Sequence, residues 1–231
     1  MLRDKPFVIG ETYHLYNRGA HKQDIFTCEA DYRRLSLLLF LANNSSPVNI
    51  RETLRKYKGQ TFAKIFEEER PDKSLVDIYA YCLMPNHFHL ILHGKCEGGV
   101  TKFMTKVLTG YSMYFNTVHG HSGILAQGAF KSKHIDTEAY FRYIFSYVHI
   151  NPVSLVAPNW EADGIADLSV VRDFFQTYQY SSFYDYSIGL RPERAVLAYE
   201  EAPDFLKTQN DLEELLKLYN TCKGQTFVRW G

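Results

Sequence analysis

The strongest constraint on this chain comes from residues 81–92 (YCLMPNHFHLIL), which place His87 and His89 two positions apart inside an apolar segment. Alternate residues of a strand project from the same face, about 6.6 Å apart along the backbone, so the two imidazoles can converge on one cation. The opposite face carries Phe88 and Leu90 and is apolar. The segment therefore predicts a strand with a core face and a metal-binding face. The alternative is a half-buried strand whose histidines hydrogen-bond to backbone or water.

Such a histidine pair leaves coordination positions open, which is typical of catalytic rather than structural metal sites. His93 lies on the same face but roughly 13 Å beyond His89, too far to bind the same ion. The cysteines, at positions 28, 82, 96 and 222, lack Cys-x-x-Cys spacing. The sequence therefore indicates neither a zinc ribbon nor a disulfide scaffold.

A second polar pattern lies at the end of a predicted helix. This helix begins near Thr137, a suitable capping residue, and ends before Pro152, whose ring disfavours helical geometry in the preceding residue. Within it, Tyr140, Tyr147 and Asn151 follow the spacing of one helix face. The pattern predicts a tyrosine hydroxyl beside an amide oxygen. The alternative is that these tyrosines are core aromatics, in a chain with 17 Tyr and 16 Phe.

Taken together, these segments resemble the single-tyrosine HUH transposases, and most closely the REP-associated tyrosine transposases, which have an IS200-like transposase domain. The motifs that carry the resemblance are, in chain order, residues 16–19 (YNRG), 24–26 (DIF), 84–90 (MPNHFHL), 127–133 (QGAFKSK) and 147–153 (YVHINPV). The resemblance implies an α+β fold, with a ferredoxin-like antiparallel sheet packed with helices. In that arrangement the histidines of the central strand face the tyrosine helix.

The resemblance also implies roles for individual residues. His87 and His89 match the ligands of a divalent cation, Mg²⁺ or Mn²⁺, and Asn151 takes the place of the third ligand. Tyr147 matches the nucleophile that attacks a DNA phosphodiester and becomes joined to the 5′ phosphate, with Tyr140 as the second candidate. The expected activity is cleavage and joining of single-stranded DNA that bears a hairpin or an imperfect palindrome. A homodimer is a possible assembly.

Elementary chemistry supports the same roles. A phenol has a pKa near 10, so it is a weak nucleophile at neutral pH unless its anion is stabilised. A hard cation supplies that stabilisation, polarises the phosphate, and accepts imidazole and oxygen ligands. Because imidazoles ligate only when neutral, we expect metal affinity to decline as the pH falls through about 6.5.

Three cations are expected to hold the phosphates that flank the cut: Arg18, Lys131 and Lys133. The formal net charge is zero, which counts against a generic nucleic-acid binder. However, residues 1–150 have 19 Lys and Arg against 14 Asp and Glu, a net charge of +5, and residues 151–231 have a net charge of −5. Two other functions remain open. One is a domesticated hairpin-DNA-binding protein that does not cleave; the other is a phosphoesterase that uses water, for which the motifs supply few carboxylates.

At 231 residues and 45% hydrophobic content, the chain can form one domain with a sizeable core. We expect a catalytic domain over residues 1–155, with a charged, helical insertion at about 45–74, and a C-terminal extension over residues 156–231. The longest apolar run, residues 35–42, is too short to span a bilayer, so we expect a soluble, cytoplasmic protein with no membrane partner.

The periodicity of apolar residues predicts the individual elements. Strands are expected at residues 13–17, 75–83, 87–92 and 128–135, and helices at 31–43, 101–118, 137–151 and 211–219. The aromatic segment at 227–230 could stack on single-stranded bases or pin a C-terminal tail onto the core.

Overall fold

The structure is a computed structural model that describes residues 6–69 and 72–222, so the aromatic segment at 227–230 lies outside the described residues. The strands are β1 (Thr12–Arg18), β2 (Val76–Met84), β3 (His87–Gly94) and β4 (Lys131–Ile135). The helices are α1 (Glu29–Leu41), α2 (Ile50–Lys56), α3 (Ala63–Glu68), α4 (Gly99–His119), α5 (Glu138–Ile150), α6 (Trp160–Asp163), α7 (Leu168–Thr177), α8 (Asp204–Thr208) and α9 (Leu212–Cys222). Single turns of tighter or wider helix lie at η1 (Ala20–Lys22), η2 (Asn151–Leu155), η3 (Tyr184–Ile188) and η4 (Pro192–Val196).

The four strands form one antiparallel sheet in the order β2-β3-β1-β4. Helix α1 connects β1 to β2, a tight turn at Pro85 and Asn86 connects β2 to β3, and α4 connects β3 to β4. This order and these connections are those of a ferredoxin-like sheet, as predicted. The histidine strand β3 and strand β1 are therefore the two central strands.

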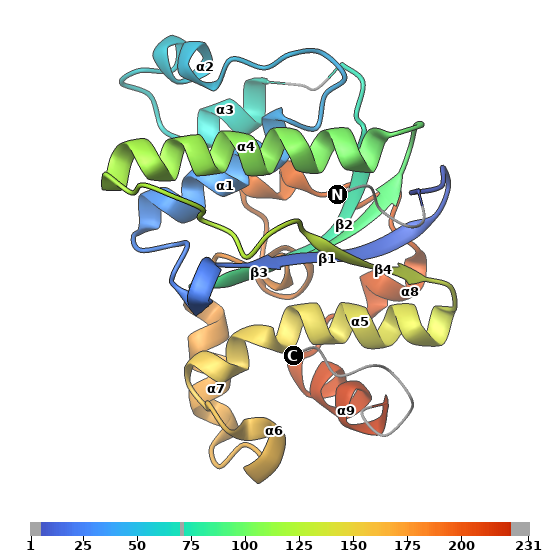
Figure 1. The fold of residues 1–231 in the computed structure, drawn as a ribbon. Coiled ribbons are helices and arrows are strands. Elements are labelled where there is room, and N and C mark those ends of the chain that lie inside the picture. Colours follow the sequence, from blue (N-terminus) through green and yellow to red (C-terminus); the bar gives the residue numbers. More distant parts are fainter. Residues whose placement is uncertain (1–5, 70–71, 223–231) are drawn as a thin grey trace.

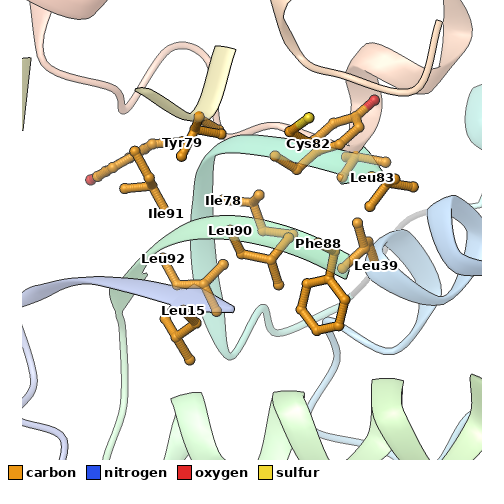
Figure 2. Close-up of a cluster of buried hydrophobic side chains, with 14 of the residues drawn as sticks. Leu15, Leu39, Ile78, Tyr79, Cys82, Leu83, Phe88, Leu90, Ile91 and Leu92 are labelled. Atoms are coloured by element: carbon orange, nitrogen blue, oxygen red, sulfur yellow. The ribbon is translucent and has the colours of Figure 1, made fainter. Parts of the chain in front are cut away.

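One face of the sheet packs on helices α1 and α4 and forms the main apolar core. Figure 2 shows Leu15, Phe88, Leu90 and Leu92 on the side of the sheet where α4 lies. All four side chains are at most 3% exposed. The predicted alternation in β3 is therefore confirmed on this face: each second residue enters the core, and the intervening residues point to the other side.

Helix α5 covers the opposite face of the sheet, and α9 packs against α5 on the side away from the strands (Figure 1). Thr137 caps α5, since its hydroxyl accepts a hydrogen bond from the backbone N–H of Tyr140 at 3.2 Å. Tyr143 of α5 stacks on Tyr219 of α9, with ring centroids 5.6 Å apart. The polar side chains of β3 therefore lie between the sheet and α5, the helix that carries the tyrosines.

The outer edge of β2 is covered by the chain that follows α7. The backbone N–H of Leu83 donates to the oxygen of Tyr180 at 2.9 Å, and that of Ser182 donates to the oxygen of Tyr81 at 2.9 Å. Asp185 forms an ion pair with Arg191, at 2.7 Å, that closes this segment. All nine residues of β2 are buried as a result, although the sequence showed only an alternating apolar pattern.

The predicted elements agree with the structure apart from details of their ends. The fourth strand begins at Lys131 rather than at residue 128, because Gly128 has φ +76° and belongs to a turn. The charged insertion contains two short helices, α2 and α3. The division of the chain at residue 155 stays a prediction. Within residues 6–69 and 72–222, no helix is both long and apolar enough to cross a membrane.

Candidate active site

Strand pairing brings the first two motifs together on the face that α5 covers. In the register of β1 and β3, Arg18 lies opposite His87 and Tyr16 lies opposite His89. On the other side of β1, Lys131 of β4 lies opposite Tyr16. Because residues opposite each other in a sheet project to the same face, these side chains share one surface.

The YNRG and QG motifs hold the end of this surface together through backbone contacts. The N–H of Gly19 donates to the oxygen of Asn86 at 2.8 Å, which ties β1 to the turn before the histidine strand. The N–H of Gln127 donates to the oxygen of Arg18 at 2.7 Å. A Cβ at Gly19 would lie 2.1 Å from the backbone oxygen of Gln23, so this position has no room for a side chain. These motifs therefore shape the site.

His87 faces two oxygen acceptors. Its Nδ1 lies 2.6 Å from Oδ1 of Asn86, and its Nε2 lies 3.1 Å from Oδ1 of Asn151. Burial lowers the pKa of His87 to about 4, opposed by the hydrogen bond to Asn151 and assisted by the charge of Arg18, so the ring is neutral at pH 7. A neutral imidazole has one N–H and one lone pair, so it satisfies only one of the two oxygens. The other nitrogen and oxygen then face each other as a pair of ligands suited to a cation.

His89 is almost fully buried, at 3% exposure, and its Nδ1 lies 2.8 Å from Nε2 of His14. Burial, then the neighbouring His14 and His87, holds the pKa of His89 well below its usual value. Burial, then the charge of Lys133, lowers the pKa of His14 to about 3. These imidazoles are therefore neutral and available as ligands or hydrogen-bond partners. His14 was not among the site residues predicted from the sequence; its position two residues before Tyr16 on one strand face was the available signal.

Tyr147 lies beside the histidines. Its ring centroid is 5.3 Å from that of His89, and the two planes are nearly perpendicular. Burial raises the pKa of the Tyr147 phenol above its usual value, while a hydrogen bond with Asn151 lowers it. The phenol is therefore protonated at neutral pH, and its deprotonation during a reaction requires a stabilising charge.

The two other tyrosines of α5 lie elsewhere. Tyr140 is 2% exposed, and Nζ of Lys133 lies 4.5 Å from its ring centroid. Tyr143 is 6% exposed and faces α9 through its contact with Tyr219. Tyr140 shares the sheet-facing side of α5, as the spacing predicted, but it packs beside Lys133 rather than beside the histidine pair.

A small hollow of about 90 Å³ lies among these groups. Its lining consists of Tyr16, Asn17, Arg18, His87, His89, Gln127, Lys131 and Tyr147. Five of the seven residues selected from the sequence line this hollow. The other two, Asn151 and Lys133, are not part of the lining. Oδ1 of Asn151 nevertheless lies 3.1 Å from Nε2 of His87, which does line the hollow. A larger hollow, of about 550 Å³, lies in the insertion between Leu41 and Glu69 and contains none of the motif residues.

The donor set at the hollow fits a hard divalent cation, because it combines two neutral imidazoles with an amide oxygen. A second possible ligand group, Cys28, Asp31 and His119, has ligand atoms within 4.8 Å of one another. However, Oδ2 of Asp31 already accepts hydrogen bonds from Thr27 and Cys28, and Oδ1 accepts from Tyr114 and His119. That group is accounted for as the network that caps α1, where Cys28 and Asp31 form a capping box.

Comparison with known proteins finds a matching family model and similar solved structures. The family model described as "Transposase IS200 like" matches residues 40–151, a span that includes the histidine strand and ends at Asn151. No curated protein matches the chain. Among solved structures, that of a REP-associated tyrosine transposase bound to a REP hairpin aligns with 88% of this chain and 92% of that chain, at 15% sequence identity and a TM-score of 0.45. The family match agrees with the resemblance seen in the motifs: residues 40–151 of this chain are similar to the IS200-like transposases.

Proposed function

We propose that this protein is a metal-dependent DNA strand transferase that cleaves single-stranded DNA and remains joined to the 5′ phosphate through Tyr147. The observation that carries the proposal is the position of Tyr147. It is the one tyrosine of α5 that lines the hollow shared by His87 and His89. A protein that only binds DNA would not require a phenol beside two neutral imidazoles and an amide oxygen.

In the proposed reaction, the phenol oxygen of Tyr147 attacks a backbone phosphorus. A bond forms between this oxygen and phosphorus while the bond from phosphorus to the 3′ oxygen breaks. The phenol loses its proton, and the departing 3′ oxygen gains one and leaves as a 3′ hydroxyl. Because one phosphate ester replaces another, a 3′ hydroxyl can attack the phosphotyrosine and rejoin strands. This reversibility separates a strand transferase from a nuclease that transfers phosphate to water.

We assign His87, His89 and Asn151 as the ligands of a divalent cation, Mg²⁺ or Mn²⁺. When bound, such an ion polarises the scissile phosphate and stabilises the negative charge of the attacking oxygen. Asn151 has a second role, since its hydrogen bond with Tyr147 lowers the pKa of the phenol and orients it. Burial of the histidines keeps both rings neutral, as ligation requires.

The proposed substrate is single-stranded DNA that bears a hairpin or an imperfect palindrome. The hollow is small and lies between the sheet and α5, so one flexible strand enters it at a lower deformation cost than a base-paired duplex. Arg18 and Lys131 line the hollow and are assigned to the flanking phosphates. Lys133 lies beside Tyr140 outside the lining, so we assign it a smaller part in binding.

The proposal is tested by incubating the protein with end-labelled, hairpin-bearing single-stranded DNA and Mn²⁺, and measuring the adduct that survives denaturation. Tyr147→Phe should abolish the adduct, because it removes only the attacking hydroxyl. Tyr140→Phe is the matched control, on the same helix face, and should retain the adduct. An adduct that persists in Tyr147→Phe would contradict the assignment. Hairpin binding with no adduct in the wild-type protein would favour the domesticated binding protein instead.

A further inference from the structure

The candidate site contains a third histidine, which contacts one of the proposed metal ligands, His89. His14 of β1 is fully buried, at 0% exposure, and its Nε2 lies 2.8 Å from Nδ1 of His89. The two rings are stacked, with centroids 5.0 Å apart, and the ring of Tyr16 stacks on His14 at 5.2 Å. His14 is absent from the lining of the hollow. It therefore contacts His89 from outside the lining of the hollow.

This contact decides which nitrogen of His89 can bind a cation. Since Nδ1 faces His14, a cation in the hollow can use only Nε2. Buried imidazoles are neutral, and a neutral imidazole has one N–H and one lone pair. If Nδ1–H of His89 donates to His14, then Nε2 of His89 keeps its lone pair. If Nε2–H of His14 donates instead, the proton of His89 lies on its Nε2 and blocks coordination.

His87 shows the same arrangement. Both of its nitrogens face amide oxygens that only accept hydrogen bonds, and the contact of Nδ1 with Oδ1 of Asn86, at 2.6 Å, is shorter than that of Nε2 with Asn151, so we assign the one ring proton to Nδ1 of His87. Its Nε2 is then the lone-pair nitrogen, and it lies 3.1 Å from Oδ1 of Asn151. A cation that binds both histidines through Nε2 therefore requires the corresponding proton on Nδ1 of His89.

We propose that His14 is a positioning residue, which accepts the Nδ1–H of His89 and thereby directs the Nε2 lone pair of His89 into the hollow. The inference rests on the proposed function, because it gives His14 a purpose at the assigned metal site. Histidine ligands commonly donate their second N–H to an acceptor, usually a carboxylate, a backbone carbonyl or water, and loss of that partner lowers metal affinity about 10- to 100-fold; here the acceptor would be the imidazole of His14. The tautomer of His89 can be measured without metal or DNA.

Two substitutions separate the hydrogen bond from the packing of the ring. His14→Phe keeps a planar ring but removes the acceptor. His14→Gln supplies an amide oxygen that can accept from Nδ1 of His89. The matched control is His93→Phe, which removes a hydrogen bond of the same kind between the same strands, from Thr12 to His93 at 3.2 Å. If His14→Phe does not fold, His14→Asn replaces it, since its shorter side chain is polar but does not reach His89.

The first measurement is nitrogen-15 NMR of the histidine rings in the metal-free protein. We expect His89 to be protonated on Nδ1 in the wild type, His14→Gln and His93→Phe, and to lose this preference in His14→Phe. The second is a titration with Mn²⁺ followed by electron paramagnetic resonance. The affinity should fall about 10- to 100-fold in His14→Phe and recover substantially in His14→Gln.

Either of two results would overturn the inference: a wild-type His89 protonated on Nε2, or a His14→Phe variant that binds Mn²⁺ as tightly as the wild type does. A wild-type protein that binds no Mn²⁺ would instead contradict the proposed function. In that case, the NMR comparison still decides whether His14 sets the tautomer of His89.

Discussion

Lowering the pH from about 7.5 to about 5.8 should leave the Mn²⁺ affinity of this protein almost unchanged. A histidine with an ordinary pKa of about 6.5 binds metal about 5.5-fold more weakly at pH 5.8 than at pH 7.5, so two such ligands together lose roughly 30-fold. Burial lowers the pKa of His87 to about 4, and that of His89 well below its usual value. At pH 5.8 the His87 ring is then only about 2% protonated. The structure thus moves the expected decline in affinity from about pH 6.5 to about pH 4.

The assay is a Mn²⁺ titration at both pH values, followed by electron paramagnetic resonance, with circular dichroism to establish that the protein stays folded. The control is a variant in which both His87 and His89 are replaced by alanine, and it should bind Mn²⁺ weakly at either pH. A loss of about 30-fold in the wild type would refute the reasoning, because it would mean that the two rings titrate as exposed histidines do. Equal affinity in the wild type and the double variant would show that the histidines are structural.

Other predictions follow from the same geometry. Gly19→Ala should lower the melting temperature and the adduct yield together, because the new Cβ would meet the backbone oxygen of Gln23 at 2.1 Å. Arg18→Ala and Lys131→Ala should each weaken binding to all single-stranded sequences and reduce the salt slope by about 0.7, whereas Lys133→Ala, outside the hollow, should change the slope less. The free energy of unfolding, measured in urea, should be highest above about pH 6.5. It should fall by roughly 1 kcal/mol at pH 5.8 for each buried histidine with a lowered pKa, because the unfolded chain binds the proton that the folded chain excludes.

The individual strands and helices were predictable because they depend on local patterns, whereas the ferredoxin-like order of the strands was implied only by the family resemblance. The alternation around His87 and His89 specified a strand with one apolar face, and the Pro85–Asn86 turn specified its hairpin with β2. In α5, Tyr147 follows Tyr140 by seven residues and Asn151 follows Tyr147 by four, and these separations place Tyr147 and Asn151 on one side of a helix. Periods of two and 3.6 residues are properties of the backbone, so they can be read without tertiary information.

The sequence alone did not specify which of the predicted cations line the hollow. The sequence ranked Arg18, Lys131 and Lys133 together, but only the first two line the hollow. Lys131 and Lys133 project from the same face of β4. In the register with β1, however, Lys131 lies opposite Tyr16, and Lys133 lies two residues farther along the strand, opposite His14 and beside the ring of Tyr140. Which lysine reaches the hollow depends on how far along the sheet α5 extends, and no local pattern specifies that distance.

The sequence by itself determined the chemical groups, since the spacing of two histidines on a strand, and of a tyrosine and an asparagine on a helix, follows from the geometry of each element. Only the tertiary structure decided which of these groups meet. It set Nε2 of His87 at 3.1 Å from Asn151, placed His14 beside His89, and directed Tyr140 and Tyr143 away from the hollow that Tyr147 lines. These outcomes depend on strand register and on the packing of α5 between the sheet and α9, which join residues distant in the chain. Burial between these layers also lowered the pKa values of the histidines, because desolvation arises only when the layers pack.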